Sequence, residues 1–316
     1  LTISTLDLAQ LHNELTVSVI EAFYSALAAR EYVQIAKQGV QTVQKQLELV
    51  RVRYEAGGAL KSELLSVEVR LSQAKEDLVV ARSNYQQLLA SLANLLGLDA
   101  NARLDPVESA LPAPEFPEDY LPALTLALSQ RSELAKVREQ VVKSRLGLAA
   151  ASSGYLPRLD LQAKYYHDDP DFLDYDLDRK NWTVGLMLNW QIFSGFLTPA
   201  KIDQSRAMLR EMLAADRQTV QTIQLDLKSA LLEREQARAR VEVTSKSVGQ
   251  AEESLRLVQI EYEGGSATIT RYLNAQLARD RARVNAVTAV YDLKKAQANL
   301  GRALGHWSNL PSSIPE

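Results

Sequence analysis

Two turn sequences that share the pattern Tyr-Glu-x-Gly lie 208 positions apart in this chain. "RYEAGGAL" runs from Arg53 to Leu60, and "EYEGGSAT" runs from Glu261 to Thr268. The similarity continues at the same offset with no insertion, and the matched residues are Tyr54, Glu55, Gly57, Ala74, Ala81, Leu92, Leu96 and Gly97 with Tyr262, Glu263, Gly265, Ala282, Ala289, Leu300, Leu304 and Gly305. A fixed internal period is typical of folds built from repeated units. The chain is therefore predicted to contain two structural repeats.

Apolar residues on both sides of the first turn recur every seven positions. One such line is Leu15, Ala22, Ala29, Ala36, Val43 and Val50, and another is Leu64, Leu71, Leu78, Tyr85 and Leu92. Sustained heptads predict coiled-coil helices, and glycine just after a helix is typical of its end. We therefore predict a helical hairpin over 1–97 with its tip near 55–59, and a second over 198–305 with its tip near 263–267.

The predicted helices are long, and one of them carries a row of alanines. The helix that ends at Tyr54 would measure about 75 Å, which is typical of a rod or tube rather than of a compact globule. In the last helix a heptad row consists entirely of alanine, at Ala275, Ala282, Ala289, Ala296 and Ala303. Small side chains let a neighbouring backbone approach closely, so this row is interpreted as a helix-packing seam.

The segment between the two hairpins has a different character. Five prolines, from Pro106 to Pro122, predict an irregular connector over 98–123. A further helix is predicted from about Leu124 to Ser153, within a segment 124–154, and a β-hairpin over 155–197. The residues 306–316 are interpreted as a C-terminal tail.

The hairpin segment shows strand periodicity in "LPRLDLQAKYY" and "NWTVGLMLNWQIF". Apolar and polar residues alternate over about ten positions in each, and the second stretch carries Trp182 and Trp190 at its ends. Aromatic residues at the ends of alternating strands are typical of lipid-facing strands, with Tyr165, Trp182 and Trp190 as membrane-interface aromatics. Any half-buried strand alternates as well, so a soluble hairpin remains an alternative at this point.

Composition and charge exclude several classes of function. The net charge is −3 with cations scattered among anions, which gives no footprint for nucleic acid, and the absence of cysteine removes thiol chemistry. The histidines, His12, His167 and His306, have no nucleophile or carboxylate at an informative spacing, so neither an enzyme nor a cofactor or metal site is predicted. The aspartates between 167 and 180 lack the spacing of a calcium loop and predict a solvated loop.

No stretch reaches the roughly 18 consecutive apolar residues of a membrane helix, and the first ten residues lack the features of a signal peptide. Any contact with a membrane is therefore expected to be made by strands.

The order of these elements resembles the outer-membrane efflux protein family, the TolC-type channels. The resemblance rests on "RSELAKVREQVVKSRLGLAAASSGYLPRLDLQAKYY", on "NWTVGLMLNWQIFSG" and on the two tips with the helices that follow them. It covers nearly all of the chain. It implies a mainly α protomer of long antiparallel coiled-coil hairpins in two repeats, with a β-hairpin that contributes to an outer-membrane β-barrel.

The resemblance also implies the place and partners of the protein. Such channels are homotrimers in the outer membrane of Gram-negative bacteria, in contact with lipid there, and most of each chain lies in the periplasm. They are passive exit ducts of tripartite efflux or type I secretion systems. Their partners are a periplasmic adaptor, the membrane fusion protein, and through it an inner-membrane transporter.

The chain departs from the family pattern at its start. The repeat offset places the expected partner of the β-hairpin upstream of Leu1, so we expect a natural protein with about 80 further residues of the first repeat and a leader. Two strands per protomer would give six in a trimer, below the eight of the smallest usual barrels. The chain alone is therefore not expected to form the family's pore.

The family's adaptor contacts carry over to the two tips. The matching positions are Arg53, Tyr54, Glu55, Gly57 and Gly58 at the first tip, and Tyr262, Glu263, Gly264, Gly265 and Ser266 at the second. Glycine after a helix also serves simply as a cap, and a tyrosine can pack the last turn. Both tips nevertheless keep Tyr and Glu where a bare turn needs only glycine, which favours contact with a partner.

Some family members close their aperture with aspartates that match Arg271 and Asn274. Neither residue is acidic here, so that gate is not expected in the same form. The repeat counterpart of Arg271 is Glu63, and an ion pair between them would provide another constriction, while solvated surface charges are the alternative.

A different class of function stays open on the residues alone. A soluble coiled-coil scaffold or adaptor would bind partner helices through the same hairpins, yet it needs neither the tryptophan-ended strand nor a second hairpin upstream.

Overall fold

The structure is a computed structural model that describes residues 2–108, 116–167 and 180–309. Its elements, in chain order, are α1 (Thr2–Glu55), α2 (Lys61–Leu95), α3 (Tyr120–Gln130), α4 (Ser132–Ser152), the 3-10 helix η1 (Ser153–Tyr155), β1 (Arg158–His167), β2 (Lys180–Asn189), α5 (Leu197–Glu263), α6 (Ile269–Leu304) and the 3-10 helix η3 (His306–Asn309). The fold is mainly helical, with two helical hairpins and one small sheet, as predicted. The aspartate-rich loop and the last residues of the tail lie outside the described residues.

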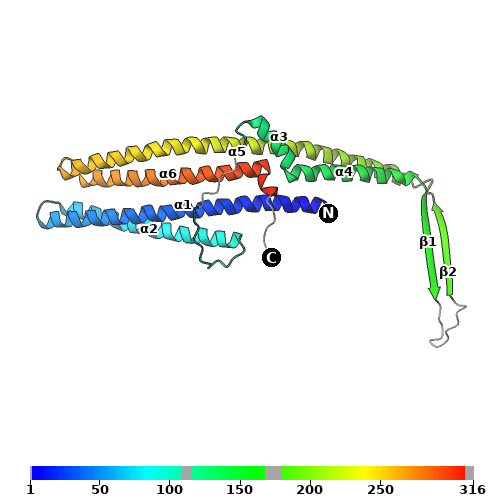
Figure 1. Cartoon of the computed structure of the whole chain (residues 1–316), viewed down its shortest axis with the longest axis horizontal. Coiled ribbons are helices and arrows are strands. Elements are labelled where there is room, and N and C mark those ends of the chain that lie inside the picture. Colours follow the sequence, from blue (N-terminus) through cyan, green and yellow to red (C-terminus); the bar gives the residue numbers. More distant parts are fainter. Residues whose placement is uncertain (1, 109–115, 168–179, 310–316) are drawn as a thin grey trace, which may run out of the picture. The chain divides into compact units, whose positions relative to one another are not determined.

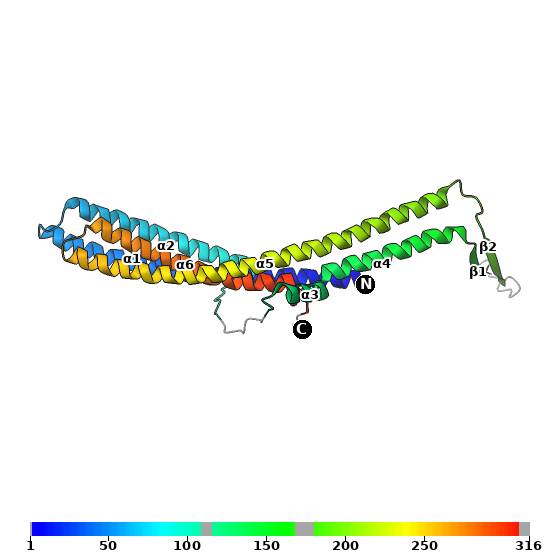
Figure 2. The same ribbon diagram turned by 90° about the horizontal axis from the view of Figure 1, so that it is seen from above.

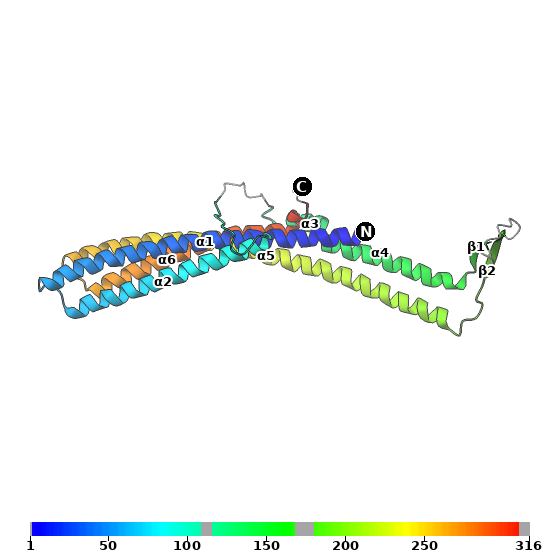
Figure 3. The ribbon, with the colours of Figure 1, turned by 90° about the horizontal axis from the view of Figure 1, so that it is seen from below.

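The chain forms two compact units. Unit 1 consists of Leu1–Glu133 and Gln221–Glu316, and unit 2 consists of Leu134–Val220. Within unit 1, α1 and α2 form one antiparallel hairpin, and α6 returns along the part of α5 that belongs to the same unit (Figure 1). Figure 2 and Figure 3 show the same arrangement from two further sides, with both hairpin turns at one end of the unit.

The heptad residues form the core of unit 1. Near the turns, one cluster of buried residues draws on all four helices and consists of Val43, Val50, Val67, Ala74, Leu255, Val258, Ile269, Tyr272 and Leu273. A second cluster, between α1 and α6, contains Leu27, Ala28 and Tyr291. Four of the five alanines of the predicted seam, Ala282, Ala289, Ala296 and Ala303, are buried, and Ala275, nearest the turn, is half-buried.

The prediction of one helix from about Leu124 to Ser153 is wrong in two respects. The helix already begins at Tyr120, so the irregular connector ends earlier than expected, and it is interrupted at Arg131. Arg131 has an extended backbone with φ −72° and ψ 120°. Its guanidinium group is buried among partners from other helices, and the extended backbone at this residue separates α3 from α4.

Unit 2 contains the sheet. β1 and β2 pair antiparallel from Arg158 opposite Asn189 to His167 opposite Lys180. Trp182 is the third residue of β2, and Trp190 lies just beyond its end, whereas the sequence pattern placed tryptophans at both ends of the strand. Among the helices within the described residues, none combines the length and the apolar character needed to cross a membrane.

Candidate functional site

The two hairpin turns have the same backbone structure. Gly57 and Gly265 both have φ +76°, in the left-handed region that glycine adopts without strain. At the first turn Gly57 N–H donates to the carbonyl of Tyr54 (2.9 Å) and Gly58 N–H to that of Arg53 (2.7 Å). These bonds close the end of α1 in the manner of a glycine C-cap.

The second turn repeats these bonds at the 208-residue offset. Gly265 N–H donates to Tyr262 O (3.1 Å), and Ser266 N–H donates to Glu261 O (2.8 Å). The hydroxyl of Ser266 also donates to Glu261 O (3.0 Å). The sequence repeat is therefore a repeat of local structure, and we call residues 53–60 tip one and residues 261–268 tip two.

The tips are joined by a contact that links the repeats. The guanidinium of Arg53 lies over the ring of Tyr262, 5.3 Å from its centre, and Tyr262 stacks on Tyr272 with ring centres 5.6 Å apart. A cation over an aromatic face is attracted by the ring's electron density. Burial raises the pKa of the Tyr272 hydroxyl, so this ring stays neutral.

Most of the predicted contact residues are open to solvent. Arg53, Tyr54, Glu55, Gly57 and Gly58 are exposed at tip one, and Glu263, Gly264, Gly265 and Ser266 are exposed at tip two. Tyr262 is half-buried between Arg53 and Tyr272. An added Cβ at Gly57 or Gly265 would meet nothing within 4 Å, so glycine is required there by conformation and not by crowding.

The aperture residues lie at the starts of the returning helices. Arg271 forms an ion pair with Glu261 (2.9 Å), and its backbone N–H donates to the side chain of Thr268, which caps α6. Within this chain Arg271 is therefore paired with Glu261 and not with Glu63. Asn274 is exposed one turn further along α6.

Two of the predicted aromatics, Tyr165 and Trp182, lie on one face of the sheet. Tyr165 is opposite Trp182, Ala163 opposite Val184, Leu161 opposite Leu186, and Leu159 opposite Leu188. Alternate residues of a strand share a face, so these eight side chains form a single apolar face. Every one of them is exposed in the chain. The Nε1 of Trp190 donates to the carbonyl of Tyr155 (3.3 Å), outside the paired region.

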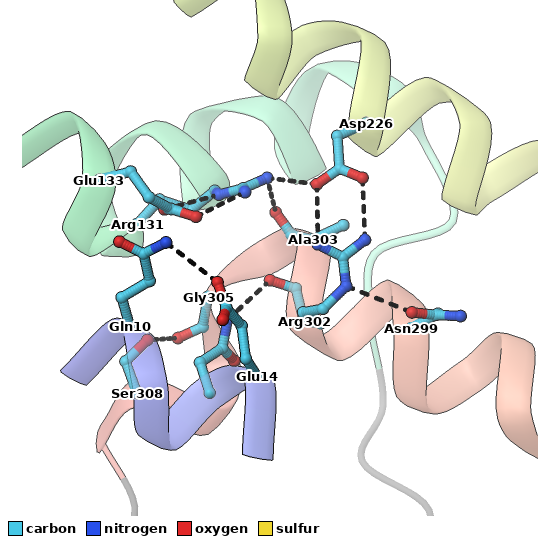
Figure 4. A network of polar contacts seen from close by, with 11 residues as sticks. Gln10, Glu14, Arg131, Glu133, Asp226, Asn299, Arg302, Ala303, Gly305 and Ser308 are labelled. Carbon is cyan, nitrogen blue, oxygen red and sulfur yellow. Dashed lines mark hydrogen bonds and ion pairs between the residues drawn. The ribbon is translucent and has the colours of Figure 1, made fainter. Parts of the chain in front are cut away.

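A charged network in unit 1 was not predicted from the sequence. Arg131 binds Glu133 through two hydrogen bonds (2.8 and 3.0 Å) and Asp226 through a third (2.6 Å). Asp226 also accepts from Arg302 (2.9 Å), as Figure 4 shows. The network ties the break between α3 and α4 to α5 and to the end of α6.

Burial and pairing act in opposite directions on the two acids of this network. Burial alone would raise the pKa of Glu133, but the hydrogen bonds and charge of Arg131 outweigh it and hold that pKa below its ordinary value. Burial is likewise outweighed at Asp226, where hydrogen bonds from Arg302 and Arg131 lower the pKa. Burial also opposes the charge of Arg131, whose pKa is nevertheless raised by its two acidic partners.

The fold and these tips define a duplicated protein of helical hairpins with a strand pair that exposes an apolar face. A sequence model of the family described as outer membrane efflux protein matches residues 2–98 and 123–306. Because the match covers most of the chain, the chain belongs to the outer membrane efflux protein family.

Individual relatives agree with this assignment. The chain is 29% identical over 199 residues to the alkaline protease secretion protein AprF of Pseudomonas aeruginosa. This match covers 61% of this chain and 40% of AprF. It is 24% identical over 302 residues to the pyoverdine export outer membrane protein OpmQ of the same species, covering 96% of this chain and 63% of OpmQ. The chain thus spans less than two thirds of the length of these relatives.

Solved structures share the fold. The outer membrane protein VceC of Vibrio cholerae superposes with a TM-score of 0.80 at 19% identity, covering 96% of this chain and 74% of VceC. The CmeC outer membrane channel of Campylobacter jejuni superposes with a TM-score of 0.83 at 16% identity, covering 96% of this chain and 65% of CmeC. The TolC-like fold class predicted from the sequence is confirmed.

Proposed function

We propose that this chain is part of an exit duct in the outer membrane of a Gram-negative bacterium, serving a tripartite efflux or type I secretion system. Most of the chain lies in the periplasm, and substrates driven by an inner-membrane transporter pass outward through the duct without a catalytic step or a cofactor. Membership of the outer membrane efflux protein family supports this role. The names of its relatives include both protease secretion and pyoverdine export.

The exposed apolar face of β1 and β2 is the observation that carries the proposal. A hairpin in water would be expected to bury such a face, because large exposed apolar patches are rare on soluble monomers. Leu161, Leu186 and Trp182 are 72%, 68% and 74% exposed. Lipid of the outer membrane is the partner that fits a flat apolar face ending in aromatic residues. A soluble scaffold would have no use for it.

The tips supply the contact with the rest of the pump. We assign adaptor contact to the exposed residues of tip one and tip two, which lie together at one end of unit 1. Homotrimers are the expected assembly, since the family resemblance implies them. In such an assembly each protomer would present both of its tips to the membrane fusion protein.

A charge placed on the apolar face tests the proposal. Leu186→Arg in the full-length natural protein is expected to lower the amount recovered in the outer-membrane fraction and to abolish export, because an arginine facing lipid costs about 2–4 kcal/mol at mid-membrane. Gln162→Arg adds the same charge to the opposite face and serves as the control. Export and membrane recovery are measured in cells that lack the chromosomal gene. Normal recovery and export with Leu186→Arg would overturn the proposal.

A further inference from the structure

The ion pair of tip two has a charge-reversed counterpart in tip one. Glu261 and Arg271 are 2.9 Å apart and join the end of α5 to the start of α6. Their repeat counterparts at the 208-residue offset are Arg53 and Glu63. The same two positions therefore carry one cation and one anion in both tips, with the signs exchanged.

The backbone of tip one resembles that of tip two where the two residues are held. The glycine with positive φ and the two bonds that close the helix end are common to both turns, and α2 and α6 begin at equivalent positions, Lys61 and Ile269. An arginine side chain is longer than a glutamate, and exchanging the two residues keeps their combined reach. From this equivalence we infer that the side chains of Arg53 and Glu63 can reach one another, as those of Glu261 and Arg271 do.

Arg53 is nevertheless placed on another partner in this structure. Its guanidinium lies 5.3 Å from the centre of the Tyr262 ring, in tip two. Among the described residues, Glu63 has no ion-pair partner, although Arg271 at the corresponding site of tip two has one. The contact with Tyr262 thus leaves the local acceptor of Arg53 unused.

We propose that Arg53 exchanges between two partners, Tyr262 in tip two and Glu63 in tip one, and is the positioning residue that couples the tips. On Tyr262 it joins the tips, and on Glu63 it closes tip one alone. Cation–π contacts and ion pairs are both weak and of similar strength at exposed sites, so neither partner holds Arg53 permanently. Arg53 is exposed, and exposed side chains change rotamer within nanoseconds. This exchange does not depend on which substrate or pump the protein serves.

Salt distinguishes the two states. An exposed ion pair is screened by added salt, which weakens the bond to Glu63. The contact of the Arg53 guanidinium with the half-buried ring of Tyr262 is not a salt bridge and is less sensitive to added salt. Raising the salt concentration therefore favours the joined tips, provided that Glu63 is present to compete.

The absence of cysteine makes a distance measurement between the tips direct. Nitroxide labels on Ala59→Cys and Ala267→Cys, equivalent positions of the two tips, report the tip-to-tip distance in the full chain by electron paramagnetic resonance. Two partners of equal strength would divide Arg53 evenly, so Glu63→Gln is expected to raise the short-distance fraction roughly twofold. Arg53→Ala is expected to broaden the distribution, and Arg51→Ala, which removes an ion pair with Glu68 on the same hairpin, leaves it unchanged.

The response to salt and the two variants test the exchange and the coupling separately. Added salt is expected to shift the doubly labelled protein toward the short distance and to leave the Glu63→Gln variant unchanged. An unchanged distribution in Glu63→Gln would overturn the exchange, and an unchanged distribution in Arg53→Ala would overturn the coupling itself. An equal shift in the distance distribution on adding salt, with and without Glu63, would also overturn the exchange.

Discussion

Gly57 and Gly265 determine the shape of the two tips. Each has φ +76°, and an added Cβ at either position would meet nothing within 4 Å. A side chain there would therefore be unfavourable only because of the backbone conformation. A β-branched residue resists this conformation more than any other type. The tips depend on glycine at these two residues, although the helices that lead to them do not.

We predict that Gly57→Val or Gly265→Val abolishes export while helix content stays unchanged. Valine strains the left-handed turn by about 1–3 kcal/mol, and relief of that strain displaces the exposed residues of the tip. Export by the full-length protein and the far-ultraviolet circular dichroism of the purified variants are the measurements.

Gly97→Val is the matched control for the tip glycines. Gly97 has φ +70° and equally open surroundings, but it follows α2 at the end opposite the tips. The valine in Gly97→Val imposes a similar backbone strain far from the proposed adaptor contact, so export is expected to persist. If the tip variants export normally, the tips do not make the contact assigned to them.

The helices could be predicted from the sequence because heptads and glycine caps are local signals. The turns of both hairpins follow from these signals within a few residues, and the ten-residue strands follow from the alternation of apolar and polar residues. The break at Arg131 could not be predicted, since "LSQRSEL" continues a helical pattern and Asp226, the partner that holds Arg131, is 95 residues away. Only the packing of α5 and α6 against this segment makes an extended Arg131 favourable.

At the scale of these elements, the Arg131 network is predicted to make stability sensitive to acid. The pKa values of Glu133 and Asp226 are lower in the folded chain than in the unfolded chain, so their contribution is complete at neutral pH. It decreases as the pH falls below the ordinary values of about 4 and is lost once the pH passes the folded values. Thermal unfolding followed by circular dichroism between pH 7 and pH 3 measures this decrease.

Removing one acid of the network tests the same interpretation. Asp226→Ala is expected to lower the free energy of unfolding at pH 7 by about 3 kcal/mol, because it deprives a buried arginine of a partner, and to flatten the acid dependence. Glu253→Gln in the same helix removes an exposed carboxylate paired with Arg256 and is expected to change stability little. Equal effects of the two variants would contradict a role for the buried network.

At the scale of the whole molecule, the repeat offset predicted both hairpins and the common structure of their turns. It could not predict that the tips lie side by side, because internal similarity does not say which surfaces of two repeats meet. The contact of Arg53 with Tyr262 exists only because packing in unit 1 brings α1 next to the end of α5. The apolar face of the strand pair, by contrast, was visible in the alternation of Leu159, Leu161 and Tyr165 with polar residues.

The most direct test of the exit-duct account is a photo-crosslinking amino acid at Glu263 in the full-length protein, in living cells, with adducts identified by mass spectrometry. The account predicts a periplasmic adaptor of the membrane fusion class as the main adduct. The same substitution at Glu242, an exposed position earlier in α5 and away from the tip, is the control and is expected to give much less of the adaptor adduct. Absence of the adaptor at Glu263, or equal capture at Glu242, would contradict the account.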